Sequence, residues 1–147
     1  DGPLCGCGRR GCLEAMASGT AIAREAKAGL KRGESSLLAK LAGAGEPTAK
    51  HVGEAARSGD PFSTKLLRES FTYLGLGIVS LLNVLDPEMV VIGGGVSNLD
   101  DLLFDPVREI VKENFGASPL ADVPIVKAEL GADVGVLGAA MLVVAQN

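Results

Sequence analysis

The chain has 147 residues and a formal net charge of −4, and 47% of its residues are hydrophobic and 22% charged. This balance is typical of one folded domain and argues against a disordered chain. Aromatic residues make up only 3%, and no strong basic patch is present, so neither feature of a nucleic-acid-binding surface is found. The sequence shows no secretory leader and no apolar run of membrane-spanning length, so we expect a cytoplasmic location and no membrane contact.

The first half of the chain is predicted to be mainly helical. After a glycine-rich loop over residues 1–12, apolar spacing and capping residues predict three helices, over 13–28, 35–42 and 48–57. Asp60 is then an N-cap residue followed by a first-turn proline, which marks a helix start. The helix that follows carries apolar residues every three or four positions as far as Leu85, so we expect it to lie in the core.

The second half of the chain alternates strands and helices. The apolar run Met89–Ile92 predicts a strand that is covered on both faces. Three further elements are expected: a helix centred on 107–115 that begins at the cap-plus-proline pair Asp105-Pro106, a strand over 124–128, and a final apolar helix over 134–144. This order predicts an α/β layer. Four aspartates of this half are assigned only surface or capping roles: Asp86, Asp100, Asp101 and Asp105.

Three cysteines, Cys5, Cys7 and Cys12, lie within eight residues. An odd number cannot form a closed set of disulfides, and thiolates are strong zinc ligands. Glycines between the cysteines allow the backbone to turn around an ion. The spacing favours a structural metal site over three free cysteines or a catalytic thiol. His51, the only histidine, is expected on a distant helix, so the fourth ligand should lie outside this chain.

Two further features have two interpretations each. Glu14 stands in the first turn of a predicted helix, where it can interact with the helix dipole or bind a ligand. Gly93, Gly94 and Gly95 follow an apolar strand, where they can form a tight connection or let backbone N–H groups approach a phosphate. This turn matches neither the P-loop pattern nor the dinucleotide-binding fingerprint.

The string that runs from Cys5 to Gly19 resembles the signature of the ROK family, which contains repressors, open reading frames and kinases. It fits the pattern C-x-C-G-x-x-G-C-x-E followed by A-S-G. Other stretches that resemble the family are Gly59-Asp60, LGLG at 74–77, NVLDPE at 83–88, VIGGGVS at 91–97 and LGAA at 137–140. The resemblance covers the whole chain as the second half of the family.

The resemblance implies the fold of the actin and hexokinase group, which belongs to the ribonuclease H-like ATPases. Residues 1–132 would form part of the large carboxy-terminal lobe, with a zinc knuckle at 1–14. Residues 133–147 would form a terminal helix that packs against the amino-terminal lobe. The family binds zinc through three cysteines and a histidine of an upstream E-x-G-H motif. Cys5, Cys7 and Cys12 match those cysteines, whereas no position matches the histidine.

The resemblance also implies a function: ATP-dependent phosphorylation of a hexose, as in glucokinases. Glu14 would bind sugar hydroxyls, Gly93, Gly94 and Gly95 would bind ATP with its Mg²⁺, and the zinc would hold the loop before Glu14. The family's D-x-G-x-T phosphate loop and catalytic aspartate have no match, so we interpret the chain as a fragment that is inactive alone. A homodimer is expected. The alternative is a sugar-sensing repressor whose upstream helix-turn-helix binds DNA.

Overall fold

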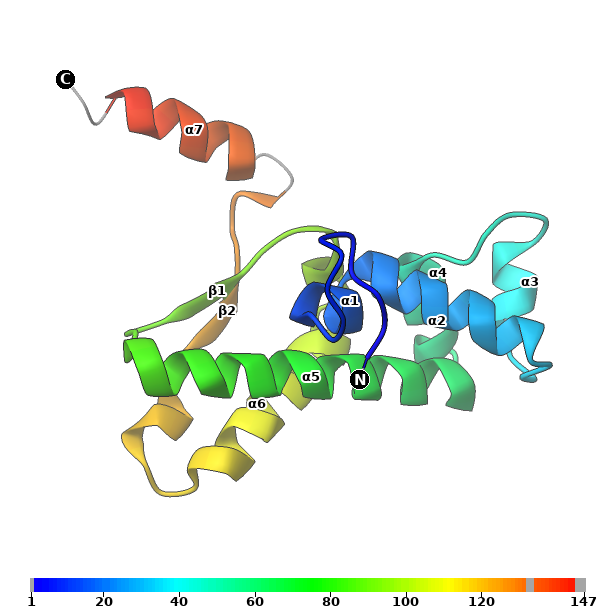
Figure 1. Ribbon diagram of the computed structural model, residues 1–147, viewed down its shortest axis with the longest axis horizontal. Coiled ribbons are helices and arrows are strands. Elements are labelled where there is room, and N and C mark those ends of the chain that lie inside the picture. Colours follow the sequence, from blue (N-terminus) through cyan, green and yellow to red (C-terminus); the bar gives the residue numbers. More distant parts are fainter. Residues whose placement is uncertain (1, 132–133, 145–147) are drawn as a thin grey trace.

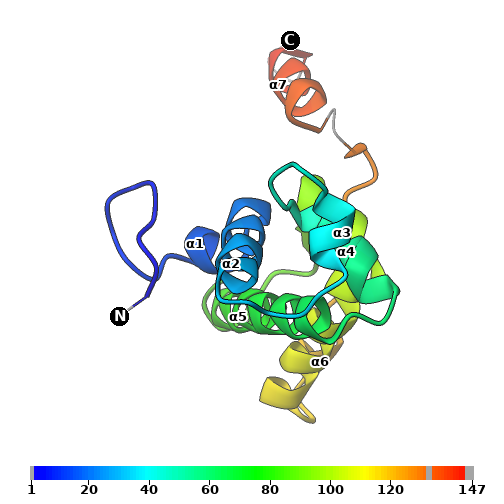
Figure 2. The same ribbon diagram turned by 90° about the vertical axis from the view of Figure 1, so that its right-hand side faces the viewer.

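The structure is a computed structural model that describes residues 2–131 and 134–144. Figures 1 and 2 show helices gathered around one long helix, with a small sheet at one end. The elements follow in this order: α1 Leu13–Ala17, α2 Gly19–Lys31, α3 Leu38–Ala42, α4 Ala49–Arg57, α5 Pro61–Leu85, β1 Val90–Ile92, the 3₁₀ helix η1 Gly95–Leu99, α6 Asp101–Phe115, the 3₁₀ helix η2 Pro119–Asp122, β2 Ile125–Lys127 and α7 Val134–Val144.

Helix α5 is the centre of the fold. It starts as the sequence predicts, because the Asp60 carboxylate accepts a hydrogen bond from the Ser63 N–H at 2.8 Å and Pro61 occupies the first turn. Helices α1, α2, α4 and α6 pack against it. The largest fully buried apolar side chains, on α5 and the other helices, are Phe71, Ile22, Leu38, Leu82, Leu103, Val52, Val107 and Val111. Burial of this apolar surface is the main stabilising contribution to the fold.

Strands β1 and β2 form a two-stranded parallel sheet, with Val90 opposite Ile125 and Ile92 opposite Lys127. The connection between them runs through α6, as parallel strands require. This arrangement confirms the predicted α/β layer. The prediction that the first strand is covered on both faces is wrong for the described residues, since Val91 is 58% exposed. No described layer covers its outer face.

Two helix predictions are wrong, one in its continuity and one in its start. The helix expected over 13–28 is divided at Ser18, whose backbone is extended and whose hydroxyl accepts the Ala21 N–H at 3.1 Å as the N-cap of α2. Helix α6 begins at Asp101, so Asp105 is not its N-cap and Pro106 lies inside it. A proline at this position removes one intrahelical hydrogen bond, and the packing of α6 against α5 offsets that loss.

Helix α7 occupies the predicted range and stands apart from the other helices (Figures 1 and 2). Two of its apolar side chains are strongly exposed, Val136 at 74% and Met141 at 62%. Of the expected terminal helix 133–147, residue 133 and residues 145–147 lie outside the described residues. Within the ranges that the structure covers, no helix combines the length and apolarity that a bilayer crossing requires.

Candidate functional site

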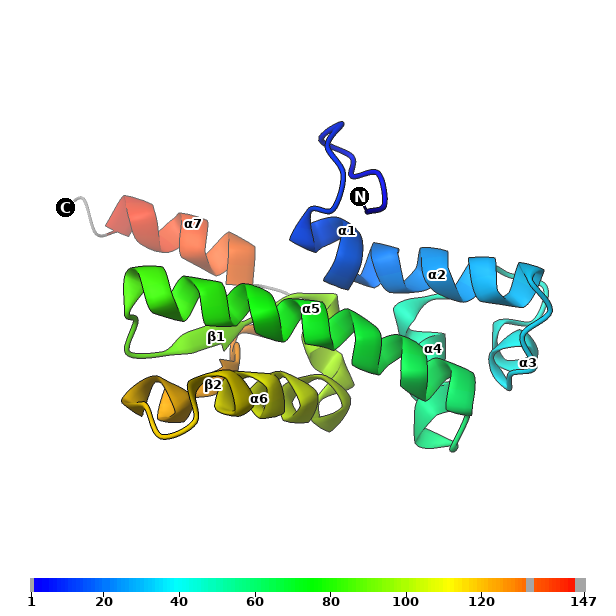
Figure 3. The same cartoon turned by 60° about the horizontal axis from the view of Figure 1, so that its bottom comes forward.

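The first candidate site is the loop that carries the cysteines, which Figure 3 shows projecting from α1. Backbone hydrogen bonds close this loop, among them Cys5 N–H to Arg9 O at 2.8 Å and Gly11 N–H to Pro3 O at 3.0 Å. Gly8 and Gly11 adopt φ values of +83° and +70°. Both values lie in the region that favours glycine, as the sequence pattern predicts for a turn around an ion.

The three thiols meet in the structure. The sulfur atoms of Cys5, Cys7 and Cys12 all lie within 4.8 Å of one another, and Cys7 Sγ is 3.6 Å from Cys12 Sγ. A tetrahedral zinc ion with Zn–S bonds of 2.3 Å holds its sulfurs about 3.8 Å apart, so the donor set fits zinc in type and spacing. His51 lies on α4 and is outside this cluster. Among the described residues, the cluster therefore offers three protein ligands.

Contacts in the cluster also shift the pKa values of Cys7 and Cys12 in opposite directions. A hydrogen bond with the Arg9 backbone, together with the sulfur contacts, lowers the pKa of Cys7. The contact with Cys7 raises the pKa of Cys12 to about 11. These opposite shifts of the pKa values of Cys7 and Cys12 are expected where a thiolate disfavours a second negative charge beside it. A bound cation favours the thiolate form of all three.

Glu14 lies directly beside the cysteines, in the first turn of α1. Its Oε2 atom is 3.5 Å from Cys5 Sγ, and the side chain lines a cavity of about 130 Å³ with Ser18, Thr20 and Arg24. Arg24 donates from Nη2 to the Ala15 carbonyl at 2.9 Å, so α2 also fixes the helix that carries Glu14. An exposed carboxylate next to hydroxyl and guanidinium groups can accept hydrogen bonds from a polar ligand.

The second candidate site is the glycine turn at the carboxyl ends of the parallel strands, where ligands bind in open α/β sheets. Gly93, Gly94 and Gly95 line a cavity of about 300 Å³ together with Ser97, Asn98, Ala128 and Gly131. Gly94 has φ +84°. At Gly93 a Cβ atom would lie 3.3 Å from the Ala128 methyl group, so a larger residue would crowd the two walls. The turn gives a ligand close access to backbone N–H groups.

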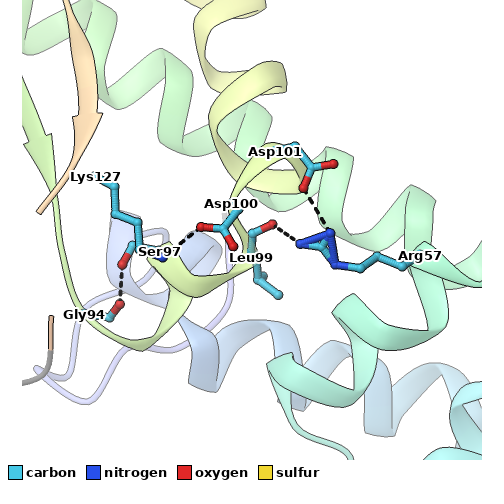
Figure 4. Close-up of polar contacts among 7 residues, drawn as sticks. All are labelled: Arg57, Gly94, Ser97, Leu99, Asp100, Asp101 and Lys127. Carbon is cyan, nitrogen blue, oxygen red and sulfur yellow. Dashed lines mark hydrogen bonds and ion pairs between the residues drawn. The ribbon is translucent and has the colours of Figure 1, made fainter. Parts of the chain in front are cut away.

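Polar contacts fix the segment that follows the glycine turn (Figure 4). The Ser97 hydroxyl donates to the Gly94 carbonyl at 2.7 Å. Arg57 of α4 donates from Nη2 to the Leu99 carbonyl at 2.8 Å and from Nη1 to Asp101 Oδ1 at 3.0 Å. Lys127 Nζ, at the end of β2, lies 2.8 Å from Asp100 Oδ1. The turn is therefore tied to both α4 and β2.

Sequence reasoning missed three residues of this network: Arg57, Asp100 and Lys127. Asp100 and Asp101 were assigned only surface or capping roles, and nothing in the local sequence pairs them with residues 27 and 44 positions away. A weak signal was available at Lys127, a charged residue at the carboxyl end of an apolar strand. The two candidate sites themselves contain the predicted residues.

Together, the fold and the two sites define an α/β lobe with a glycine-lined cavity at its strand ends and a three-cysteine loop. Comparison with known proteins identifies the class: the chain matches the ROK family over residues 1–146 and belongs to that family. It is 42% identical over 144 residues to a glucokinase of Thermotoga maritima, covering 97% of this chain and 45% of that protein. The chain thus spans about half the length of the curated relatives it matches.

A solved structure and a regulator extend this comparison. The crystal structure of a ROK family glucokinase from Streptomyces griseus in complex with glucose and AMPPNP has a TM-score of 0.82 and 35% identity, covering 97% of this chain and 47% of that one. The xylose repressor of Caldicellulosiruptor bescii is 28% identical, covering 96% of this chain and 35% of the repressor. The resemblance to the sugar kinase fold of the actin and hexokinase group is thereby confirmed.

Proposed function

We propose that the full-length protein is an ATP-dependent hexose kinase of the glucokinase type. The observation that carries this proposal is the glycine-lined cavity at the carboxyl ends of β1 and β2, together with Glu14 in the same chain. The similarity to a glucokinase that was crystallised with glucose and AMPPNP supports it. A kinase must bind both a sugar and a nucleotide, and this lobe offers one candidate surface for each.

In this proposal, Glu14 accepts hydrogen bonds from sugar hydroxyls, and the backbone of Gly93, Gly94 and Gly95 contacts the nucleotide. Charge-assisted bonds from a carboxylate to hydroxyls are stronger than neutral ones, so one well-placed Glu14 can orient the sugar. Magnesium bound with ATP neutralises charge on the phosphates. The relatives are longer than this chain. We assign the general base and the remaining phosphate contacts to the corresponding additional part of the full-length protein.

Cys5, Cys7 and Cys12 are proposed to hold a structural zinc ion with a histidine from outside this chain. The role of the ion is to fix the loop that leads into α1. Because Glu14 follows Cys12 by two residues and its carboxylate contacts Cys5, the position of the loop determines the position of the carboxylate. The site is thus structural, and the chemistry of phosphoryl transfer depends on positioning by the surrounding protein.

Helix α7 is proposed to pack against the amino-terminal lobe, while residues 1–132 form part of the carboxy-terminal lobe. The exposed apolar side chains Val136 and Met141 support this, because an apolar helix gains stability by covering such surface. A homodimer is proposed for the full-length protein from the family resemblance. Size measurement by light scattering tests it.

The test of the proposed function is sugar-dependent ADP release by the full-length protein, measured with ATP, Mg²⁺ and a panel of aldohexoses and N-acetylhexosamines. We expect ADP release with at least one of these sugars and none without a sugar. If no sugar in the panel stimulates ADP release, the kinase proposal is wrong.

The second candidate function is a sugar-sensing repressor, which the similarity to the xylose repressor favours. A repressor requires DNA binding that a sugar weakens or strengthens, and it does not require nucleotide. Mobility shift of the DNA upstream of the protein's own gene, with and without sugar, tests it. DNA binding without any sugar-dependent ADP release would contradict the kinase proposal and support the repressor.

A further inference from the structure

Asp100 has a backbone conformation that a side chain disfavours. Its φ and ψ angles are 50° and −121°. Gly43, at 58° and −129°, and Gly116, at 56° and −114°, adopt the same conformation and likewise follow a helix. Glycine suits this region because it has no Cβ atom. The chain therefore uses glycine at two of these three positions and an aspartate at the position near the glycine turn.

Helix capping does not explain the aspartate. Asp100 is the N-cap residue of α6, but its side chain makes no capping hydrogen bond. An N-cap aspartate normally accepts a bond from the N–H two or three residues later. The carboxylate of Asp100 is instead paired with Lys127, and this contact, together with the positive charge of Arg57, lowers the pKa of Asp100. The side chain thus contacts β2 and does not cap its own helix.

The ion pair joins the two walls of the glycine-lined cavity. One wall is the segment from Gly93 to Asn98, which ends two residues before Asp100. The other wall contains Ala128, which directly follows Lys127 and whose N–H bonds to the Ile92 carbonyl at 2.9 Å. The Asp100 N–H also donates to the Ser97 carbonyl at 3.2 Å, so movement of Asp100 displaces the first wall.

We propose that Asp100 and Lys127 are positioning residues for the nucleotide: their ion pair holds the two walls of the glycine-lined cavity at the separation that nucleotide binding requires. This inference rests on the proposed function of that cavity. Strained backbone of this kind persists only where the surrounding structure enforces it, and it is frequent at ligand sites. An exposed ion pair contributes little to stability, so stability alone does not account for retaining a strained aspartate.

The first test is Asp100→Gly in the full-length protein, with two measurements. Glycine relieves the disfavoured conformation and removes the ion pair. The melting temperature is therefore expected to stay the same or rise. The dissociation constant for AMPPNP, measured by calorimetry, is expected to increase about five- to tenfold because the cavity walls lose the ion pair between them. A residue with a purely structural role would not separate the two readouts in this way.

Lys127→Met provides a second variant that keeps the backbone unchanged. It removes the same ion pair and is expected to weaken AMPPNP binding by a similar factor, about five- to tenfold. The double variant should bind no more weakly than either single variant, because both remove one interaction. Lys27→Met is the matched control: Lys27 Nζ pairs with Glu46 Oε1 at 2.7 Å with similar exposure but lies outside the cavity lining. Its AMPPNP affinity should equal that of the unchanged protein.

Two results overturn the inference and are distinguishable. If the unchanged protein binds AMPPNP and both Asp100→Gly and Lys127→Met bind it equally well, the positioning role is wrong and the proposed kinase function stands. If the unchanged protein does not bind AMPPNP at all, the nucleotide assignment of the cavity fails and the positioning role fails with it.

Discussion

The cysteine loop and the glycine turn are organised in different ways. The loop projects from α1, and among its cysteines Cys7 is exposed and Cys12 half-buried, with a few backbone hydrogen bonds to hold it. The glycine turn is built into the sheet and is tied to α4 by Arg57 and to β2 by Lys127. In the proposed zinc site the ion adds rigidity to the loop, whereas the turn is organised by the chain itself.

Because of this difference, binding of the two proposed ligands should be sensitive to different changes in the protein. Loss of a metal should disturb the sugar site and leave the nucleotide site intact. Loss of polar contacts around η1 should have the opposite effect. Single substitutions in the full-length protein should therefore affect one site and leave the other unchanged.

The largest effect is expected from Cys12→Ser. A hydroxyl is a poor substitute for a thiolate ligand, so zinc content measured by atomic absorption should fall well below one ion per chain. The loop before Glu14 then loses its fixed position, and sugar affinity should fall by more than tenfold, while AMPPNP affinity stays unchanged. Met89→Leu, a change at an exposed apolar residue, is the control for general effects of substitution. Full sugar affinity in a zinc-free variant would contradict the role of the metal.

Glu14→Gln tests the role of the carboxylate independently of the role of the metal. The substitution keeps the shape and removes the charge, and hydrogen bonds to charged groups contribute about 1.5–3 kcal/mol. We expect the KM for the sugar to rise roughly 10- to 100-fold, with unchanged zinc content and unchanged AMPPNP affinity. Glu54→Gln, on α4, is the matched control. An unchanged sugar KM would leave Glu14 with only its helix-dipole role.

Asp60→Asn changes a buried residue that lines neither candidate site. It should lower the stability of the fold without a specific effect on either site. The buried Asp60 carboxylate accepts hydrogen bonds from the Ser63 N–H, the Leu37 N–H and the Ser36 hydroxyl at 2.8–2.9 Å. Burial alone would raise its pKa, but these bonds outweigh burial and the pKa of Asp60 is lowered. Asparagine keeps one acceptor oxygen and places an NH2 donor at the other position, so part of these bonds is lost. The free energy of unfolding should fall by about 1–3 kcal/mol at pH 7, measured by urea denaturation.

The pH dependence of Asp60 has a defined sign. Because its pKa is lower in the folded state, its stabilising contribution is fully present above its ordinary value near 4 and is lost as the pH falls through the folded-state pKa. The difference in stability between the unchanged protein and Asp60→Asn should therefore shrink below about pH 4. A difference that stays constant down to pH 2 would show that the carboxylate charge does not matter.

The smallest effect is expected from Ser97→Ala. The buried Ser97 hydroxyl donates to the Gly94 carbonyl at 2.7 Å, and one neutral hydrogen bond contributes about 1 kcal/mol. AMPPNP affinity should fall about fivefold, with zinc content and sugar affinity unchanged. Ser58→Ala, which removes a similar hydroxyl-to-carbonyl bond at the exposed C-cap of α4, is the control. Equal AMPPNP affinity for Ser97→Ala and Ser58→Ala would contradict a role for this contact.

Local signals allowed most of the fold and of both sites to be predicted. Asp60 and Thr48 marked their helix starts because capping depends on neighbours within three residues. The division at Ser18 was missed because an apolar stripe continues across it. The exposed face of Val91 was missed because strand composition does not show which layers are present. Arg57, Asp100 and Lys127 were missed because their contacts join distant parts of the chain.

The most direct test of the account is to titrate glucose and AMPPNP separately into Glu14→Gln and Gly94→Ala. Alanine disfavours the φ of +84° at Gly94, so that variant should lose AMPPNP affinity and keep glucose affinity. Glu14→Gln should lose glucose affinity and keep AMPPNP affinity. If either substitution lowers the affinity for both ligands equally, or for neither ligand, the assignment of one site to the sugar and the other to the nucleotide is wrong.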